Sequence, residues 1–144
     1  LRRTDLTALT ETVVAEFVDR GGAATLADAS GLVIADIRPV LIRRALRNLI
    51  GNALKYGGVA RVHVARDRGS VCVTIDDDGP GIDQAAIETM FEPFVRAEAS
   101  RNRATGGSGL GLTIARAIAR QHGGAVTLAN RPGGGLTARL SLPG

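Results

Sequence analysis

Apolar side chains recur every three or four residues in several stretches of the chain, the spacing of amphipathic helices. This pattern predicts a helix over Thr4–Asp19 and a second over Asp36–Tyr56, with Asp36 as its N-cap. It also predicts a short helix over Gln84–Met90 and a longer one over Ser108–His122. The helix within residues 1–22 is expected to join a preceding domain.

Other stretches alternate between apolar and polar residues, as half-buried strands do. Strands are predicted at Val59–Arg66, Ser70–Asp77, Ala125–Asn130 and Leu136–Leu142, and a short hairpin at Ala24–Ala35. Asp78–Asp83 is read as a Gly/Pro loop and Arg96–Gly107 as a mobile polar loop. The order of elements predicts an α+β fold, with helices covering one face of a largely antiparallel sheet.

Composition narrows the class of protein. The 144 residues are 44% hydrophobic and 22% charged, as in a single globular domain. One cysteine cannot form an intrachain disulfide, and no apolar run is long enough to span a bilayer. The net charge is +4, and the basic residues are scattered along the chain rather than clustered. Only four aromatic residues, three Phe and one Tyr, are available to stack on bases, so we expect no nucleic-acid partner. We expect a soluble piece of a longer protein, because the chain begins at Leu1.

Four polar side chains share one face of the second predicted helix. Asn48, Asn52, Lys55 and Tyr56 fall within a sector of roughly 100° at helical spacing. Amide oxygens can coordinate Mg²⁺, an ammonium can neutralise a phosphate, and a phenol ring can stack on a base. A solvated helix face is the alternative, but the set of four favours a binding site.

The strand Ser70–Asp77 points a carboxylate inward. Val71, Val73 and Ile75 occupy the core-facing positions, and Asp77 continues their parity. A carboxylate facing an apolar layer is costly unless a donor meets it, so Asp77 is either a ligand-binding residue or is held by a structural partner such as a backbone amide. The tight turn Gly79-Pro80-Gly81 follows and leaves room for a flat ligand.

A glycine-rich run opens the last helix. Glycines allow a phosphate to approach the backbone, and a helix N-terminus offers free N–H groups. The run Gly106–Leu112 fails both the Walker A pattern and the dinucleotide-binding pattern at Leu112. By itself it is weak evidence for a phosphate site.

Together these segments resemble the sequence boxes of sensor histidine kinases, in the right order and spacing between Asp36 and Leu142. Asn48–Tyr56 resembles the N box, Asp77–Gly81 the G1 box, Phe91–Phe94 the F box and Gly107–Leu112 the G2 box. The resemblance implies the two-layer α/β sandwich called the Bergerat fold, with a mixed, mostly antiparallel sheet. That fold is shared with gyrase B, the Hsp90 chaperones and MutL.

The resemblance also implies roles for the matching residues. Asn52, with Asn48, would hold Mg²⁺, Asp77 would accept a hydrogen bond from the adenine amino group, and Tyr56 would pack on adenine. The γ-phosphate candidates are Lys55, Arg96 and Arg101. The other residues of the implied ATP site are Gly79, Gly81, Ile82, Phe94, Gly107, Ser108, Gly109, Leu110, Gly111 and Leu112.

The residue one turn before Asn52 separates branches of the superfamily. ATP-hydrolysing members carry a glutamate there that activates water, whereas this chain has Asn48, which cannot act as a general base. The resemblance therefore implies transfer of the γ-phosphoryl group of Mg-ATP to a histidine on a separate dimerisation domain. An ATP-binding regulatory module and a gyrase- or MutL-like ATPase are the alternatives.

Partners and location follow from the same resemblance. We expect the dimerisation and phosphoacceptor domain and a response regulator as partners, and the cytoplasmic side of a membrane-anchored parent as the location, with no membrane contact by this chain itself. His63 is expected to face solvent, and Cys72 is expected to lie on the outward face of its strand. His122 lies at the C-terminal end of a helix, where a positively charged ring is favoured. Neither histidine has the sequence context of a phosphoacceptor.

Overall fold

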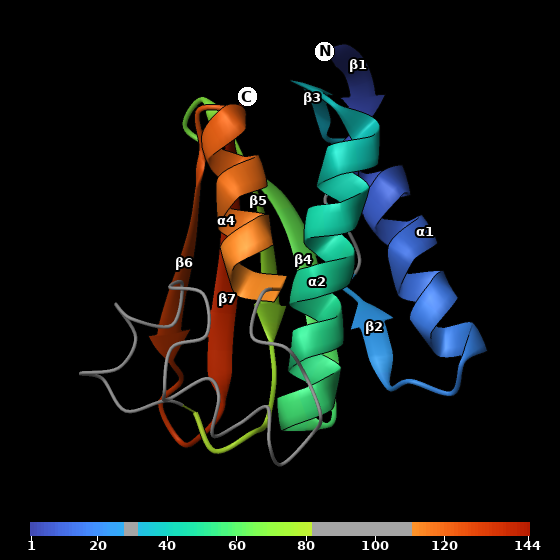
Figure 1. The fold of residues 1–144 in the computed structure, drawn as a ribbon, viewed down its shortest axis with the longest axis vertical. Coiled ribbons are helices and arrows are strands. Elements are labelled where there is room, and N and C mark those ends of the chain that lie inside the picture. The colour runs from blue at the N-terminus through green and yellow to red at the C-terminus, as the bar shows by residue number, and fades with distance from the viewer. Residues whose placement is uncertain (28–31, 82–110) are drawn as a thin grey trace.

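The computed structural model describes residues 1–27, 32–81 and 111–144, which form a helical layer on one face of a sheet (Figure 1). The helices are α1 (Leu6–Asp19), α2 (Pro39–Gly57) and α4 (Gly111–Gln121). The strands are β1 (Arg2–Asp5), β2 (Ala24–Leu26), β3 (Ile34–Ile37), β4 (Ala60–Asp67), β5 (Ser70–Asp76), β6 (Ala125–Asn130) and β7 (Leu136–Pro143). The predicted two-layer α+β class is confirmed.

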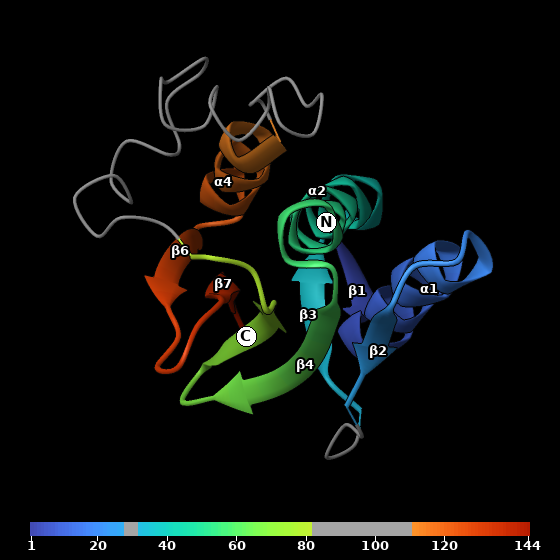
Figure 2. The same cartoon turned by 90° about the horizontal axis from the view of Figure 1, so that it is seen from below.

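The five-stranded sheet has the order β2-β4-β5-β7-β6, and only its β2–β4 pair is parallel. Seen along the layers, α1, α2 and α4 all lie on the same side of this sheet (Figure 2). The alternation of the strand residues explains why, because the inward positions Val64, Val73 and Leu140 are fully buried in one row across β4, β5 and β7.

Helix α2 is the central element of the helical layer. Its buried apolar stripe includes Ile42, Leu46, Leu49 and Ile50, each of which is at most 1% exposed. The helix ends at Gly58, whose φ of 75° is left-handed and whose N–H donates to Leu54 O. The apolar stripe fixes the rotation of α2, and therefore the direction of its polar face.

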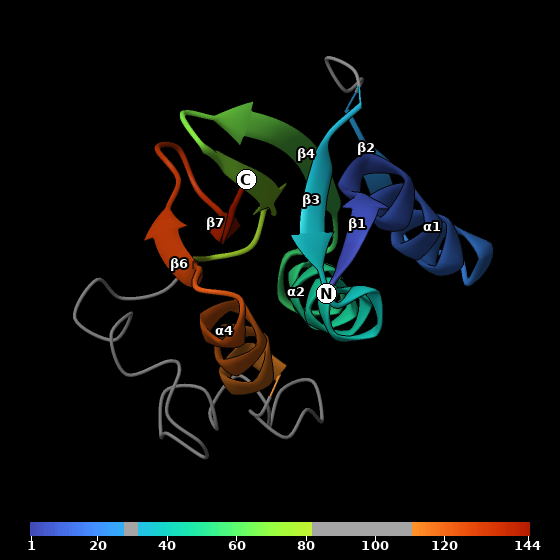
Figure 3. The same ribbon diagram turned by 90° about the horizontal axis from the view of Figure 1, so that it is seen from above.

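The N-terminal segment departs from the predicted pattern. Helix α1 begins at Leu6 rather than at Thr4, because residues 2–5 form β1 and pair with β3, as seen from above in Figure 3. Asp5 caps the helix by accepting a hydrogen bond from Ala8 N at 3.1 Å. β1 was not predicted from the sequence because a strand of only four residues, paired with a segment some thirty residues away, has no local sequence pattern that indicates it.

The predicted hairpin at Ala24–Ala35 is wrong, because its two halves belong to different sheets. β2 pairs with β4 and β3 pairs with β1. Asp36 consequently lies in β3 and is not an N-cap; Arg38 occupies the N-cap position of α2 and makes no side-chain cap hydrogen bond.

The predicted strands at residues 59–66, 70–77, 125–130 and 136–142 are confirmed within one residue at each end. The last helix is confirmed over Gly111–Gln121. The predicted helix Gln84–Met90 and the loop Arg96–Gly107 lie outside the described residues.

His122 joins the ends of two helices. Its Nε2 accepts a hydrogen bond from Arg38 N at 3.0 Å, and its Nδ1 lies 2.8 Å from Ile118 O. Nδ1 therefore carries the hydrogen and Nε2 the lone pair, which is the neutral ring rather than the helix-end cation that the sequence favoured. The ring thereby supplies an acceptor for the backbone N–H of Arg38, the N-cap residue of α2.

We expect His122→Ala to lower the free energy of unfolding by about 1–2 kcal/mol, because it leaves a helix-start N–H without its acceptor. His122→Gln keeps one acceptor and one donor and should restore part of the loss. His63→Ala is the control, since His63 is exposed on the sheet. Urea unfolding of the three variants measures the difference, and equal losses for His63→Ala and His122→Ala would contradict the assignment.

Candidate functional site

The polar face of α2 is built as the helical spacing predicted. Asn48, Asn52 and Tyr56 are half-buried at the border of the apolar stripe, and Lys55 is exposed. Exposure therefore differs across the four side chains: the two amides lie nearer the core, and the ammonium of Lys55 lies in solvent.

Asn48 has a buried polar group that the described residues do not satisfy. Its Nδ2 is buried and has no hydrogen-bond partner among the described residues. The described part of α4 starts beside it, since a Cβ built on Gly111 would lie 3.8 Å from Asn48 Cβ. A buried amide without a partner costs free energy, so this side chain is suited to a ligand that supplies the missing bond.

Asp77 is the buried carboxylate of the site, with 3% of its surface exposed. Its Oδ1 accepts hydrogen bonds from Gly79 N at 2.9 Å and from Leu136 N at 3.2 Å. Its own N–H donates to Leu136 O at 3.0 Å, which continues the β5–β7 pairing by one residue. Backbone amides thus hold Asp77, and because both bonds use Oδ1, Oδ2 has no partner among the described residues and is left for a ligand.

Glycines bring the end of α2 against this carboxylate. A Cβ built on Gly57 would lie 2.6 Å from Asp77 Oδ1, and one built on Gly79 would lie 2.7 Å from Tyr56 O. Neither position has room for a side chain. The close approach places Tyr56 and Asp77 at the same end of the helix–sheet interface.

Two arginines that the sequence analysis did not identify bind the three consecutive aspartates at positions 76–78. Arg61 binds both oxygens of Asp78, at 3.0 and 2.6 Å. Arg131 Nη1 donates to Asp77 O at 3.1 Å and to Asp78 Oδ1 at 3.2 Å. The Arg61 hydrogen bond holds the pKa of Asp78 below its ordinary value, so Asp78 stays ionised and paired on the outer side.

The remaining predicted residues divide into two groups. Gly81 has a left-handed φ of 75°, and Leu112 packs its side chain in the core at 1% exposure, so that only its main chain could face a ligand. The others lie outside the described residues: Ile82, Phe94, Arg96, Arg101, Gly107, Ser108, Gly109 and Leu110.

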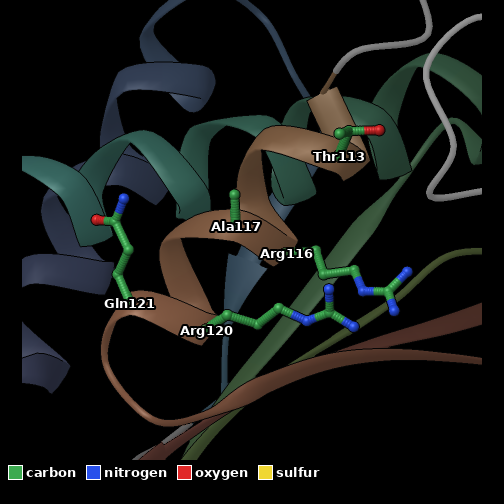
Figure 4. A pocket seen from close by; sticks show the side chains of 5 residues that line it. All are labelled: Thr113, Arg116, Ala117, Arg120 and Gln121. Carbon is green, nitrogen blue, oxygen red and sulfur yellow. The ribbon is translucent and has the colours of Figure 1, made fainter.

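Other surface features lie apart from this site. A cavity on the outer side of α4 is lined by Thr113, Arg116, Ala117, Arg120 and Gln121 and includes none of the predicted site residues (Figure 4). Cys72 does lie on the outward face of β5, yet it is buried, because Arg139 Nη2 lies 3.0 Å from its Sγ.

Two negative findings concern the described residues only. No group of three His, Cys, Asp or Glu side chains in them could hold a metal ion, so a metal here would rely on amide oxygens and on its ligand. None of the helices in these ranges is both long and apolar enough to cross a membrane.

The comparisons with known proteins agree with this geometry. Residues 37–144 match the family described as histidine kinase-, DNA gyrase B- and HSP90-like ATPase. The sensor histidine kinase GtrS of Pseudomonas aeruginosa is 44% identical over 106 residues, 74% of this chain and 22% of that protein. The histidine-protein kinase AfsQ2 of Streptomyces coelicolor is 45% identical over 117 residues, 81% of this chain and again 22% of that protein.

Solved structures give the same result over nearly the whole chain. The ATP binding domain of PrrB from Mycobacterium tuberculosis superposes with a TM-score of 0.81 at 28% identity, covering 99% of this chain and 96% of that one. The chain spans about a fifth of the length of the two sequence relatives, 22% in each case. It belongs to the histidine kinase-, DNA gyrase B- and HSP90-like ATPase family, and these named relatives are sensor histidine kinases.

Proposed function

We propose that this chain binds Mg-ATP and donates the γ-phosphoryl group to a histidine on a separate phosphoacceptor domain of a two-component sensor kinase. The observation that carries the proposal is Asp77. It is a buried carboxylate with one oxygen held by backbone amides and the other left for a ligand, next to the end of a helix that presents two amides and a lysine.

In this function each residue has a distinct task. Asp77 Oδ2 accepts from the adenine amino group, and Tyr56 packs on the ring. Asn52 and Asn48 supply amide oxygens to Mg²⁺, which would neutralise phosphate charge when bound. Lys55 contacts the phosphates. Asn48 Nδ2, a donor without a partner among the described residues, supports a bound ligand that accepts a hydrogen bond, such as a phosphate oxygen, whereas the magnesium role of Asn48 would use its amide oxygen.

Hydrolysis is disfavoured by the residue type at position 48. An amide has no basic lone pair with which to take a proton from water, so Asn48 cannot activate it. The chain would instead hold the nucleotide in position for an incoming imidazole, and catalysis would consist of positioning and charge neutralisation. A nucleotide-binding regulatory module remains the second function, and a phosphotransfer assay separates the two.

The partners belong to the same proposal. The kinship with sensor histidine kinases supports a dimerisation and phosphoacceptor domain of the same protein, and a response regulator that takes the phosphoryl group from it. We also propose that the domain works on the cytoplasmic side of a membrane-anchored parent. Arg96 and Arg101 remain candidates for the γ-phosphate.

We expect Asn52→Ala to abolish Mg-dependent ATP binding while the fold is kept, because it removes a ligand oxygen and no core volume. A thermal shift on adding Mg-ATP measures binding through its linkage to unfolding. Val40→Ala, at an exposed position of the same helix, should shift as the wild type does. An undiminished shift in Asn52→Ala would contradict the magnesium role.

We expect Asp77→Asn to weaken ATP binding more than GTP binding. The asparagine keeps an oxygen for the N–H groups of Gly79 and Leu136, so the fold holds, but its NH₂ group then faces the adenine amino group. Guanine presents a carbonyl at that position and suffers less. Calorimetric titration with both nucleotides tests this, and equal losses would remove Asp77 from the adenine site.

We expect the isolated chain to bind Mg-ATP without forming phosphohistidine. Neither His63 nor His122 has the sequence context of a phosphoacceptor, and both ring nitrogens of His122 are engaged in hydrogen bonds. Transfer needs an acceptor nearly in contact with the γ-phosphate, and tethering can supply up to about 7–11 kcal/mol of the barrier. Adding the phosphoacceptor domain in trans should restore weak labelling from radioactive ATP, whereas acid-labile label on His63 or His122 would contradict the assignment.

A further inference from the structure

We propose that Arg131 is a positioning residue for adenine recognition: it fixes the end of β5 so that Asp77 presents its free oxygen in one orientation. This inference rests on the proposed function. It concerns a residue in the turn between β6 and β7, 54 positions along the chain from Asp77.

The contacts of Arg131 converge on three successive aspartates. Its Nη1 donates to the main-chain oxygen of Asp77 at 3.1 Å and to Asp78 Oδ1 at 3.2 Å. Its Nε lies 3.8 Å from Asp76 Oδ1. One planar guanidinium therefore spans the strand end, a geometry that a lysine ammonium cannot reproduce.

The backbone of the turn aims Arg131 at this place. Arg131 N donates to Gly135 O at 3.0 Å, and Gly134 N donates to Arg131 O at 3.1 Å. Gly135 has a φ of 100°, and a Cβ built on it would lie 3.0 Å from the Asp77 carbonyl carbon. The turn thus packs directly against the residue that its arginine binds.

Asp77 is thereby held from both sides of its peptide unit. Its N–H and Oδ1 bind Leu136, and its carbonyl oxygen, one residue past the end of β5, binds Arg131. A carbonyl at this position needs a donor, and Arg131 provides it from a side chain that is 30% exposed. Asp77 Oδ2 is then held in one orientation, which the adenine base has to match.

Arg61 has a different part. It binds the Asp78 carboxylate alone, at 2.6 Å through Nη2, and no hydrogen bond joins it to Asp77 among the described residues. Removing Arg61 should raise the pKa of Asp78 back toward its ordinary value, whereas removing Arg131 should loosen the Asp77 peptide itself.

The test compares ATP with purine riboside triphosphate, which lacks the adenine amino group, on the 144-residue chain by calorimetric titration. Arg131→Gln should lower the affinity for ATP roughly five- to tenfold and change that for the analogue little, so the discrimination ratio falls. Arg131→Lys should give an intermediate ratio. Arg139→Gln is the matched control, because Arg139 pairs with Asp67 on the outward face and should leave the ratio unchanged.

A double variant separates positioning from general stability. If Arg131 acts through Asp77, Asp77→Asn with Arg131→Gln should discriminate no worse than Asp77→Asn alone. Additive losses, or an unchanged ratio in Arg131→Gln, would overturn the role of Arg131. If a thermal scan shows that Arg131→Gln does not fold, the ratio of ATP affinity to analogue affinity is measured on Arg131→Lys instead, and an unchanged ratio there would overturn the role of Arg131. A wild-type chain that binds neither nucleotide would overturn the proposed function as well.

Discussion

A carboxylate buried at the end of a strand needs hydrogen-bond donors, and much of this structure follows from which groups donate to Asp77. Its side chain takes amide hydrogens from the turn at Gly79 and from the first residue of β7. These bonds fix where β5 stops and where β7 starts. Helix α2 also ends closely against this carboxylate, which is possible because position 57 is a glycine without room for a Cβ.

The helical layer sets the other half of the site by a separate means. The apolar stripe of α2 is fully buried, and this rotation leaves Asn48 and Asn52 at its border and Lys55 in solvent. The polar face is therefore oriented by packing rather than by hydrogen bonds of its own. A ligand between the two halves would meet a rigid acceptor at Asp77 and donors and acceptors carried by a rigid helix.

Local patterns predicted the parts of the site that depend on one element. Strand parity placed Asp77 inward, and helical spacing gathered the four polar residues of α2, because both follow from periodicities of 2.0 and 3.6 residues. The same patterns missed what depends on distant pairing. β1 and β3 pair across the N-terminal region, β2 joins β4 in parallel, and Arg131 reaches Asp77 across 54 residues. The burial of Cys72 by Arg139 is of this kind too.

The charges around Asp77 also bear on the kind of chemistry that the site can support. Asp78 is ionised and bound by Arg61 and Arg131, and Asp76 pairs with Arg131 and accepts from Thr137, so these neighbours are engaged on the outer side. Asp77 uses one oxygen for the fold, and position 48 holds an amide. No carboxylate among these residues is therefore placed to take a proton from water. An imidazole acceptor needs no such base, because its unprotonated nitrogen already carries the attacking lone pair. The residue types at this site thus support the proposed transfer to an external nucleophile rather than the hydrolysis of a nucleotide.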